Sequence, residues 1–244
     1  GSGDDTVRLG ALQTWSYEIA GGGTGDDALA LDLSALDRWH RLSVTDSTSG
    51  NAYWAEAGSS WETVRGLAAA VAAAGGWDLY VPNYSVATAS VRHLEHIDIV
   101  GSAYDDLILY HGGTHYDGGA GNDTFYADFS GTAASLHWDA DANSINPVDG
   151  ITVANMERFL LASGSGDDVF RATQSGFSHH IESGAGNDRI ELGTGSDYVD
   201  AGSGDDAVRL GALQTWSYEI ADGGTGDDAL ALDLSALDRW HGLS

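Results

Sequence analysis

Three consecutive nonapeptides between Ser183 and Arg209 constrain the fold more than any other part of the chain. They read SGAGNDRIE, LGTGSDYVD and AGSGDDAVR, with glycine at the second and fourth positions, Asp at the sixth and an apolar residue at the eighth. Glycine enters conformations with φ > 0 at no steric cost, so the first six residues predict a turn. The last three predict a short strand whose middle side chain points inward. The run therefore predicts stacked parallel strands, with two nonapeptides in each coil.

The Asp of each nonapeptide is expected to lie beside the Asp two nonapeptides further on. Asp188 and Asp206 are 18 residues apart, which places them on neighbouring coils at a strand spacing of about 4.8 Å. Two carboxylates at that distance repel each other, and a cation between them removes the repulsion. Calcium prefers carboxylate and carbonyl oxygens. The pattern therefore predicts calcium ions between successive turns.

The same pattern recurs along the whole chain. Nine Asp residues stand at the sixth position, and the residue two places after each is apolar. Eight have glycine two places before; the exception is Asp106, where Ser102 and Tyr104 replace both turn glycines. The nine are Asp5, Asp27, Asp106, Asp123, Asp168, Asp188, Asp197, Asp206 and Asp228. A single motif of this kind is weak evidence, whereas nine predict metal-binding turns throughout.

The gaps between these Asp residues predict which edge each turn occupies. Only Asp197 lies nine residues from both neighbours, which is half a coil. If each other gap is one coil plus an insert, the remaining eight Asp stack along one edge. Eight stacked turns leave seven interfaces, so we expect several calcium ions, up to about seven, along that edge. Inserted loops would then decorate the opposite edge.

With these motifs in view, the chain resembles the RTX, or hemolysin-type, calcium-binding repeat region of a large secreted bacterial protein, most like a tandem-repeat RTX adhesin. The resemblance implies an all-β solenoid, a right-handed parallel β-roll. It also implies that the first four positions of each turn supply carbonyl ligands beside the Asp carboxylate. The residues carried over in this way are Gly1, Gly3, Gly23, Gly25, Gly119, Gly121, Gly164, Gly166, Ser183, Gly184, Ala185, Gly186, Ala201, Gly202, Ser203, Gly204, Gly224 and Gly226.

The resemblance also implies a location. Such proteins are usually exported unfolded by a type I system and fold in the calcium outside the cell, so we expect a secreted, extracellular or bacterial cell-surface protein. Calcium-free chain should stay expanded, because binding free energy becomes folding free energy when no site exists in the unfolded state.

A long internal repeat sets the domain organisation. Residues 1–43 and 202–244 match at 40 of 43 positions, at an offset of 201 residues. We infer a tandem array, with neighbouring copies of the repeat as partners and residues 202–244 starting the next 201-residue unit. Coils are expected at 1–33, 94–128 and 156–244, and an inserted excursion at 129–155.

The largest insert, residues 34–93, is expected to form a small ββαβ subdomain. Residues 42–46 and 52–57 predict a hairpin, and 77–81 a strand. A helix at about 60–74 is predicted by a capping box at Ser59–Glu62 and by an apolar stripe. Gly75 and Gly76 would end it.

Composition excludes several functions. The chain has 37 Asp and Glu against 10 basic residues, all of them Arg, and a net charge of −27. So acidic a surface argues against nucleic acid and anionic membranes. There is no Cys, so disulfides are excluded. No apolar run is long enough to span a bilayer, so we expect no membrane insertion.

Two functions from different classes remain. The first is a calcium-dependent structural module, a spacer or stalk. The alternative is a ligand-binding adhesin module whose aromatic-rich inserts bind a glycan or host surface, with Trp54, Trp77 and Tyr84 as candidates. No catalytic residues are predicted, because acidic pairs such as Asp105-Asp106 stand in register with the turns. A transition-metal site around His93, His96, His111 and His115 has loose spacing, and surface histidines explain it better.

Overall fold

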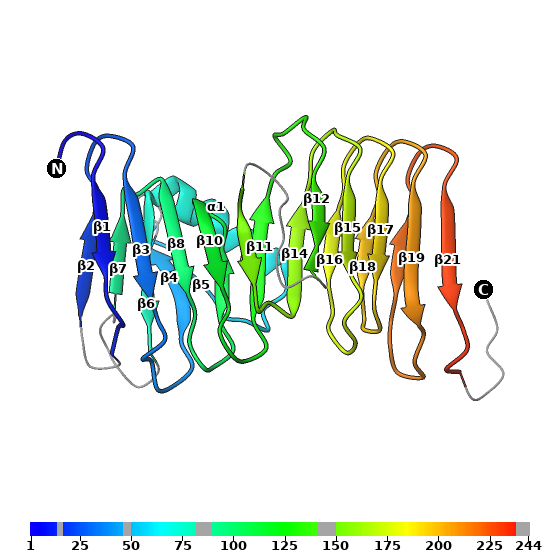
Figure 1. Ribbon diagram of the computed structural model, residues 1–244, viewed down its shortest axis with the longest axis horizontal. Coiled ribbons are helices and arrows are strands. Elements are labelled where there is room, and N and C mark those ends of the chain that lie inside the picture. Colours follow the sequence, from blue (N-terminus) through cyan, green and yellow to red (C-terminus); the bar gives the residue numbers. More distant parts are fainter. Residues whose placement is uncertain (14–16, 46–49, 82–88, 141–149, 238–244) are drawn as a thin grey trace. The chain divides into compact units, whose positions relative to one another are not determined.

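The computed structural model describes residues 1–13, 17–45, 50–81, 89–140 and 150–237. It divides into two compact units. The first holds Gly1–Tyr126 with Ile151–Met156, and the second holds Ala127–Gly150 with Glu157–Ser244. Both consist mainly of β-strands in parallel sheets, as expected for a β-roll (Figure 1).

In the first unit, five strands form an entirely parallel sheet in the order β1-β3-β8-β10-β13. Ala28, at the start of β3, pairs with Thr6 of β1 and His96 of β8. The turns that lead into these three strands therefore lie side by side at one end of the sheet. The strands are β1 (Thr6–Leu9), β3 (Ala28–Asp32), β8 (His96–Val100), β10 (Gly112–Asp117) and β13 (Thr152–Ala154).

A second sheet of the first unit has the order β2-β7-β6-β4-β5 and mixes strand directions. β2 and β7 pair in parallel, whereas β6, β4 and β5 are antiparallel to their neighbours. The strands of the large insert thus continue the sheet that contains β2 and β7. The strands are β2 (Glu18–Gly21), β4 (Arg41–Thr45), β5 (Ala52–Ala55), β6 (Gly76–Tyr80) and β7 (Ala89–Arg92).

The helix of the insert is α1, Trp61–Ala74, and its N-terminal cap differs from the expected one. Ser60 is the N-cap, and its hydroxyl accepts a hydrogen bond from the Thr63 N–H. The predicted capping box centred on Ser59 is wrong, because the Ser59 hydroxyl accepts instead from the Glu56 N–H at 3.0 Å. The left-handed Gly75 ends the helix.

The apolar stripe of α1 is buried, as its spacing predicts. Trp61, Val64, Leu67 and Val71 are all buried. The Trp61 ring packs on Tyr126, with ring centroids 5.4 Å apart. Tyr126 belongs to β11 (Thr124–Asp128), whose first residues pair in parallel with β9 (Leu107–Leu109). The helix therefore packs against β4, β5 and β6 and, through Trp61, against Tyr126 of β11.

The second unit contains a parallel sheet in the order β12-β15-β17-β19-β21 and a parallel run β14-β16-β18-β20. Chain segments alternate between the two, so each pair of strands forms one coil. The strands are β12 (His137–Asp139), β14 (Arg158–Ala162), β15 (Val169–Ala172), β16 (His180–Glu182), β17 (Arg189–Leu192), β18 (Tyr198–Asp200), β19 (Ala207–Ala212), β20 (Ile220–Asp222) and β21 (Ala229–Asp233).

The segment 129–155 is not a simple excursion from the stack. Its strand β12 pairs with β15, with Trp138 opposite Phe170, so it is itself a member of the second unit's sheet. Its strand β13 pairs with β10 in the first unit's sheet.

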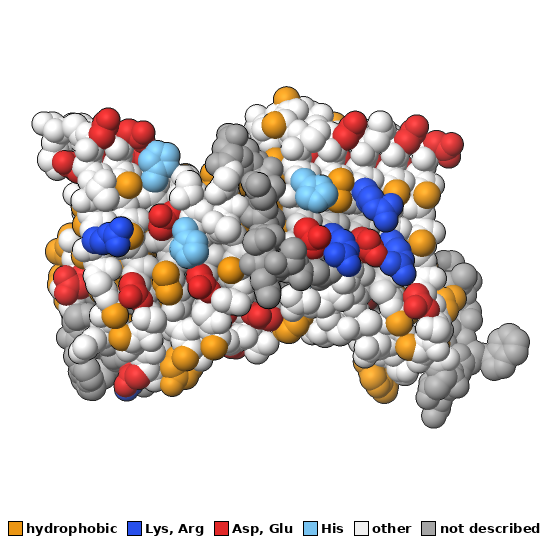
Figure 2. All heavy atoms as spheres, viewed as in Figure 1, with side chains coloured by type: hydrophobic (Ala, Val, Ile, Leu, Met, Phe, Trp, Pro, Cys, Tyr) orange, Lys and Arg blue, Asp and Glu red, His pale blue; other side chains and the backbone are white. Residues whose placement is uncertain are grey.

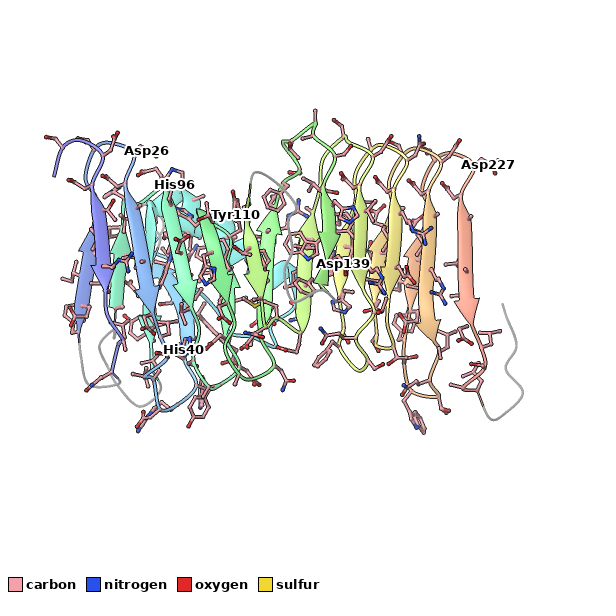
Figure 3. All side chains as sticks on the ribbon, viewed as in Figure 1. Asp26, His40, His96, Tyr110, Asp139 and Asp227 are labelled. Atoms are coloured by element: carbon pink, nitrogen blue, oxygen red, sulfur yellow. The ribbon has the colours of Figure 1, made fainter. Side chains whose placement is uncertain are left out.

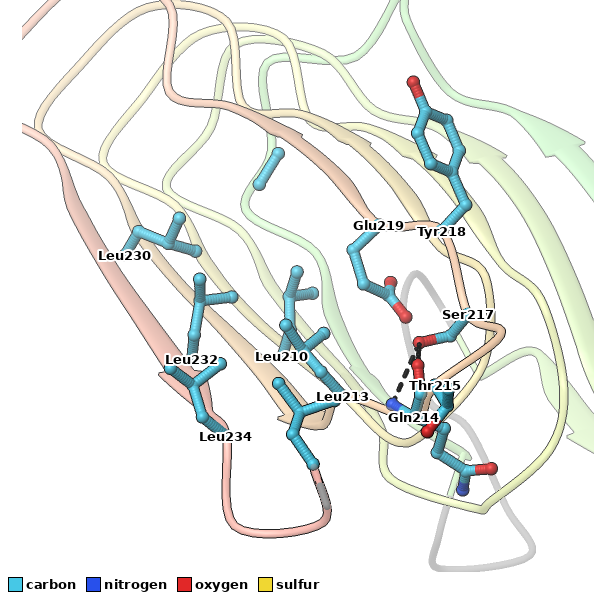
Figure 4. Close-up of a pocket in the computed structure, with 12 residues that line it drawn as sticks. Leu210, Leu213, Gln214, Thr215, Ser217, Tyr218, Glu219, Leu230, Leu232 and Leu234 are labelled. Carbon is cyan, nitrogen blue, oxygen red and sulfur yellow. Dashed lines mark hydrogen bonds between the residues drawn. The ribbon is translucent and has the colours of Figure 1, made fainter. Parts of the chain in front are cut away.

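The two copies of the repeated segment lie in different surroundings. Leu31 of the first copy is 2% exposed, because β3 has a strand on each side. Its counterpart Leu232 on β21 is 38% exposed, and β21 is the last strand of its sheet in the described residues. Leu210, Leu230 and Leu234 join it around an open hollow of about 540 Å³ (Figure 4).

Candidate metal centre

The two consensus turns Ser183–Asp188 and Ala201–Asp206 lie one coil apart and in contact. Ala185 and Ser203 form a parallel bridge between them. The Asp188 N–H donates to Asp206 Oδ1 at 2.8 Å. Each Asp is thus held by the backbone of the preceding turn, which leaves its second carboxylate oxygen available.

Glycine is required where the two turns approach each other. Gly202 has φ +87°, and a Cβ there would lie 1.9 Å from the Gly184 carbonyl oxygen. Gly204 has φ +135°, and its Cβ would lie 1.8 Å from the Gly186 oxygen. Any side chain would fill this cradle of carbonyl groups. Glycines with positive φ among the predicted ligands are Gly3, Gly23, Gly25, Gly119, Gly121, Gly184, Gly186, Gly202, Gly204, Gly224 and Gly226.

The same contact repeats along the second unit. The Asp168 N–H donates to Asp188 Oδ1 at 2.8 Å, and the Asp206 N–H donates to Asp228 Oδ1 at 3.0 Å. Ahead of Asp168 stands Leu136, whose N–H donates to Asp168 Oδ1. The stack therefore holds four Asp and begins with a residue that has no carboxylate. Gly164 and Gly166 pack on the backbone of residues 132–135 in this first step.

These carboxylates are buried without a compensating charge. The Oδ2 atoms of Asp168, Asp188 and Asp206 are buried and have no hydrogen-bond partner. Burial raises the pKa of Asp188 to about 6, and the charges of Asp168 and Asp206 add to the rise. Burial also raises the pKa of Asp168 and of Asp206. A buried carboxylate needs a cation or a proton, and the stack provides regularly spaced positions for one.

In the second unit, Arg171, Arg189 and Arg209 form ion pairs with acidic residues other than these Asp. Figure 2 shows them gathered with acidic side chains over β15, β17 and β19. There Arg209 and Arg189 pair with Glu191, and Arg171 pairs with Asp139.

Asp197 lies at the opposite end of the strands from Asp188. β17 begins after Asp188, and the turn that leaves β17 at Leu192 carries Asp197. The His179 N–H donates to Asp197 Oδ1 at 2.8 Å, and the Asp197 N–H donates to Glu219 Oε2 at 2.8 Å. Burial, with the Glu219 charge, raises the pKa of Asp197 to about 7. The buried Oδ2 of Asp197 has no partner.

In the first unit, Asp5 and Asp27 stack in the same way. The Asp5 N–H donates to Asp27 Oδ1 at 2.8 Å, and Gly1 accepts from the Thr24 N–H. The next position is taken by Glu95, whose Oε2 accepts from the Asp27 N–H at 2.9 Å. Sequence reasoning missed Glu95 and Glu219, although each has a small or apolar residue two places later, as the Asp residues do.

Asp106 and Asp123 do not belong to that stack, so the prediction of eight Asp along one edge is wrong. Their pairing is real: the Asp106 N–H donates to Asp123 Oδ1 at 2.7 Å. However, the turn that carries Asp106 leaves the far end of β8, whereas the turn of Asp27 leads into the start of the parallel strand β3. Figure 3 shows His40, which contacts Asp106, at the opposite end of the strands from Asp26.

The cause is the large insert. Because of it, counting coils from the gaps between Asp residues assigns Asp106 to the wrong end of the strands. Asp27 and Glu95 are 68 residues apart yet adjacent in the stack, and only half a coil separates Glu95 from Asp106. Neighbouring Asp–Asp pairs in the described residues number five, not seven. They are Asp5–Asp27, Asp106–Asp123, Asp168–Asp188, Asp188–Asp206 and Asp206–Asp228.

The donor set fits calcium better than a transition metal. Unpartnered carboxylate oxygens and glycine carbonyls are hard ligands. In the described part of the chain, no three His, Asp or Glu side chains converge on one point. His96 instead contacts the Gly112 carbonyl at 2.7 Å and Asp26 at 2.8 Å.

The aromatic candidates for ligand binding fall into different environments. Trp54 is 50% exposed, with Arg41 over its ring. Trp77 is 4% exposed, so its proposed role as an exposed binding ring is wrong: it belongs to the core of the insert. Tyr84 lies outside the described residues.

Comparison with known proteins agrees with this geometry. The RTX calcium-binding nonapeptide repeat matches in four copies, over residues 115–129 and 180–212. Neither the curated proteins nor the solved structures give a match. Among the described residues, no helix is long and apolar enough to cross a membrane.

Proposed function

We propose that this chain, which carries an RTX calcium-binding repeat region, is a calcium-folded structural module of a secreted or cell-surface protein. In this proposal each unit is a right-handed β-roll, and calcium ions lie between stacked Asp turns. The module serves as a spacer or stalk, since a stack of nearest-neighbour contacts becomes rigid once its sites are filled.

One observation carries the proposal. The stacked carboxylates of Asp168, Asp188 and Asp206 are buried, unpartnered and adjacent to turns that only glycine can form. Ser183, Gly184, Ala201 and Gly202 would offer carbonyl oxygens beside them. Bound calcium would supply the charge that these carboxylates lack, and its binding free energy would add to folding.

Far-UV circular dichroism through a calcium titration tests the proposal, starting from EDTA-treated protein with magnesium as the control. We expect β-structure to appear cooperatively with calcium and not with magnesium. A chain already fully folded in EDTA would show that calcium does not organise it.

A second candidate is a ligand-binding adhesin module. Trp39 and Trp54 of the large insert are each about half exposed. Trp39 also lines an open hollow of about 440 Å³ together with Glu56 and Asp105. An exposed ring beside carboxylates suits a sugar. A glycan array probed with the calcium-loaded chain tests this, and binding that survives Trp39→Ala and Trp54→Ala would argue against these rings.

A further inference from the structure

Asp106 differs from the other stacked Asp residues because both of its oxygens have partners within the chain. Its carboxylate is fully buried. The Ser102 N–H donates to Oδ2, and the Ser102 hydroxyl donates to Oδ1 at 3.0 Å. By contrast, the buried Oδ2 atoms of Asp27 and Asp188 have none.

The third contact of Asp106 comes from a histidine of the large insert. His40 Nε2 lies 3.0 Å from Asp106 Oδ1, and the two side chains are 2% and 0% exposed. The two atoms are close enough for an ion pair, but their geometry is not that of a regular hydrogen bond. His40 immediately precedes β4, the first strand of the insert, whereas Asp106 immediately precedes β9. One contact thus joins two segments far apart in sequence.

These groups leave calcium no room at Asp106. Calcium takes six to eight oxygen ligands and must reach the carboxylate lone pairs directly. Here the N–H and the hydroxyl of Ser102 direct hydrogens at those lone pairs, and the His40 ring, 3.0 Å from Oδ1, occupies the space beside that oxygen. Ser102 stands where the other turns have glycine. The residue that departs from the glycine pattern therefore also supplies the additional hydroxyl donor.

We propose that His40 replaces calcium at the Asp106 turn. The turn binds no metal, and the buried imidazole takes the place beside the carboxylate that a metal ion would occupy, fastening the insert to the Asp106 turn. This inference rests on the proposed function only in taking the other Asp turns as calcium sites.

Native mass spectrometry of the calcium-loaded chain tests the metal part of the inference. Asp106→Asn should leave the number of bound ions unchanged, whereas Asp188→Asn should lower it. Loss of an ion in Asp106→Asn would overturn the inference. A wild-type chain that binds no calcium would instead refute the proposed function, so the two failures are distinguishable.

Two further measurements keep the inference testable if Asp106→Asn does not fold. Anomalous scattering from terbium-soaked crystals of the wild-type chain should place ions beside Asp188 and none in contact with Asp106. In hydrogen exchange, His40→Asn should speed amide exchange in β4 about tenfold or more, with the bound-ion count unchanged. Terbium at Asp106, or unchanged exchange in β4, would contradict the role of His40.

Discussion

Replacing Asp188 by Asn should stabilise the calcium-free chain and weaken the calcium-loaded one. Without metal, Asp188 is a buried carboxylate between Asp168 and Asp206, and its pKa rises from 3.8 to about 6. At 1.36 kcal/mol per pKa unit, this corresponds to at most about 3 kcal/mol. Screening by water at the turn reduces it to about 1–2 kcal/mol. Asn retains the oxygen that accepts the Asp168 N–H and removes the charge.

The sign of this effect depends on pH. Below pH 3.8 the carboxyl is protonated in both folded and unfolded chains, so the residue costs nothing. As pH rises from 3.8 to about 6, the unfolded chain ionises first, and folding loses stability over that interval. Above pH 6 the cost is constant. The gain from Asp188→Asn in EDTA should therefore be complete at neutral pH and vanish at low pH.

Calcium should reverse the sign. With calcium bound, Asp188 becomes a ligand, and the Asn variant loses charge attraction and ligand strength. Circular dichroism measures both states: folding of the calcium-free chain by a stabilising osmolyte such as trimethylamine N-oxide in EDTA, and urea unfolding in millimolar calcium. A variant that is destabilised to the same extent in both conditions would refute the reasoning, because the carboxylate would then act only through packing and hydrogen bonding.

The chain offers a matched control in Asp205→Asn. Asp205 is exposed, lies one residue before a stacked Asp, and corresponds to Asn187 in the previous coil. Its substitution removes the same charge from the same region. The Asn oxygen can still accept the Asp227 N–H. We expect a change within about 0.5 kcal/mol in EDTA, which separates the buried charge from the net charge of the protein.

Three further predictions use other features of the structure. Leu31→Ala should lower the free energy of unfolding by about 2–4 kcal/mol and the equivalent Leu232→Ala by much less, because only Leu31 is fully packed. Urea unfolding of both variants measures this, and equal losses would contradict the argument from burial. Gly202→Ala should abolish calcium-dependent folding in the dichroism titration. The control Gly176→Ala, at φ +90° with no neighbour within 4 Å, should destabilise the fold only through backbone strain. Equal loss of folding in both variants would show that the close approach of the turns is not the reason. Since burial raises the pKa of Asp197 to about 7 and also that of Glu219, folding of the calcium-free chain should need more stabilising osmolyte as pH rises from about 4 to 7. A need for less osmolyte in EDTA at the higher pH would refute this.

Local chemistry explains why so much of the site could be predicted. The turn at Ser183–Asp188 is specified within six residues, since glycine, Asp and the apolar Ile190 each meet a requirement of the same coil. Ile190 and Val208 are buried as the pattern demands. The helix α1 was likewise predictable, because the stripe through Trp61 and Leu67 has helical spacing.

The edge assignment could not be predicted, because it depends on counting coils through an insert. Asp27 and Glu95 are 68 positions apart, and the segment between them contains the helix α1 and four strands of another sheet, β4, β5, β6 and β7. Nothing local to Asp106 tells which end of the strands it occupies. The partner His40 was equally hidden, since a contact between residues 66 positions apart leaves no periodic signal.

The adjacency of Asp27 and Glu95 has a consequence for how such a chain can change. The sheet fixes where the chain leaves at Asp32 and where it returns at Ala89, because β3 pairs with β8 and β2 pairs with β7. The segment between them is therefore an insert whose two ends are held in fixed positions by the sheets. Closing a loop costs only about 0.6 kcal/mol more for each doubling of its length. A foreign domain grafted between these strands should leave the carboxylate stack intact, whereas a single extra residue within Ser183–Asp188 would break it.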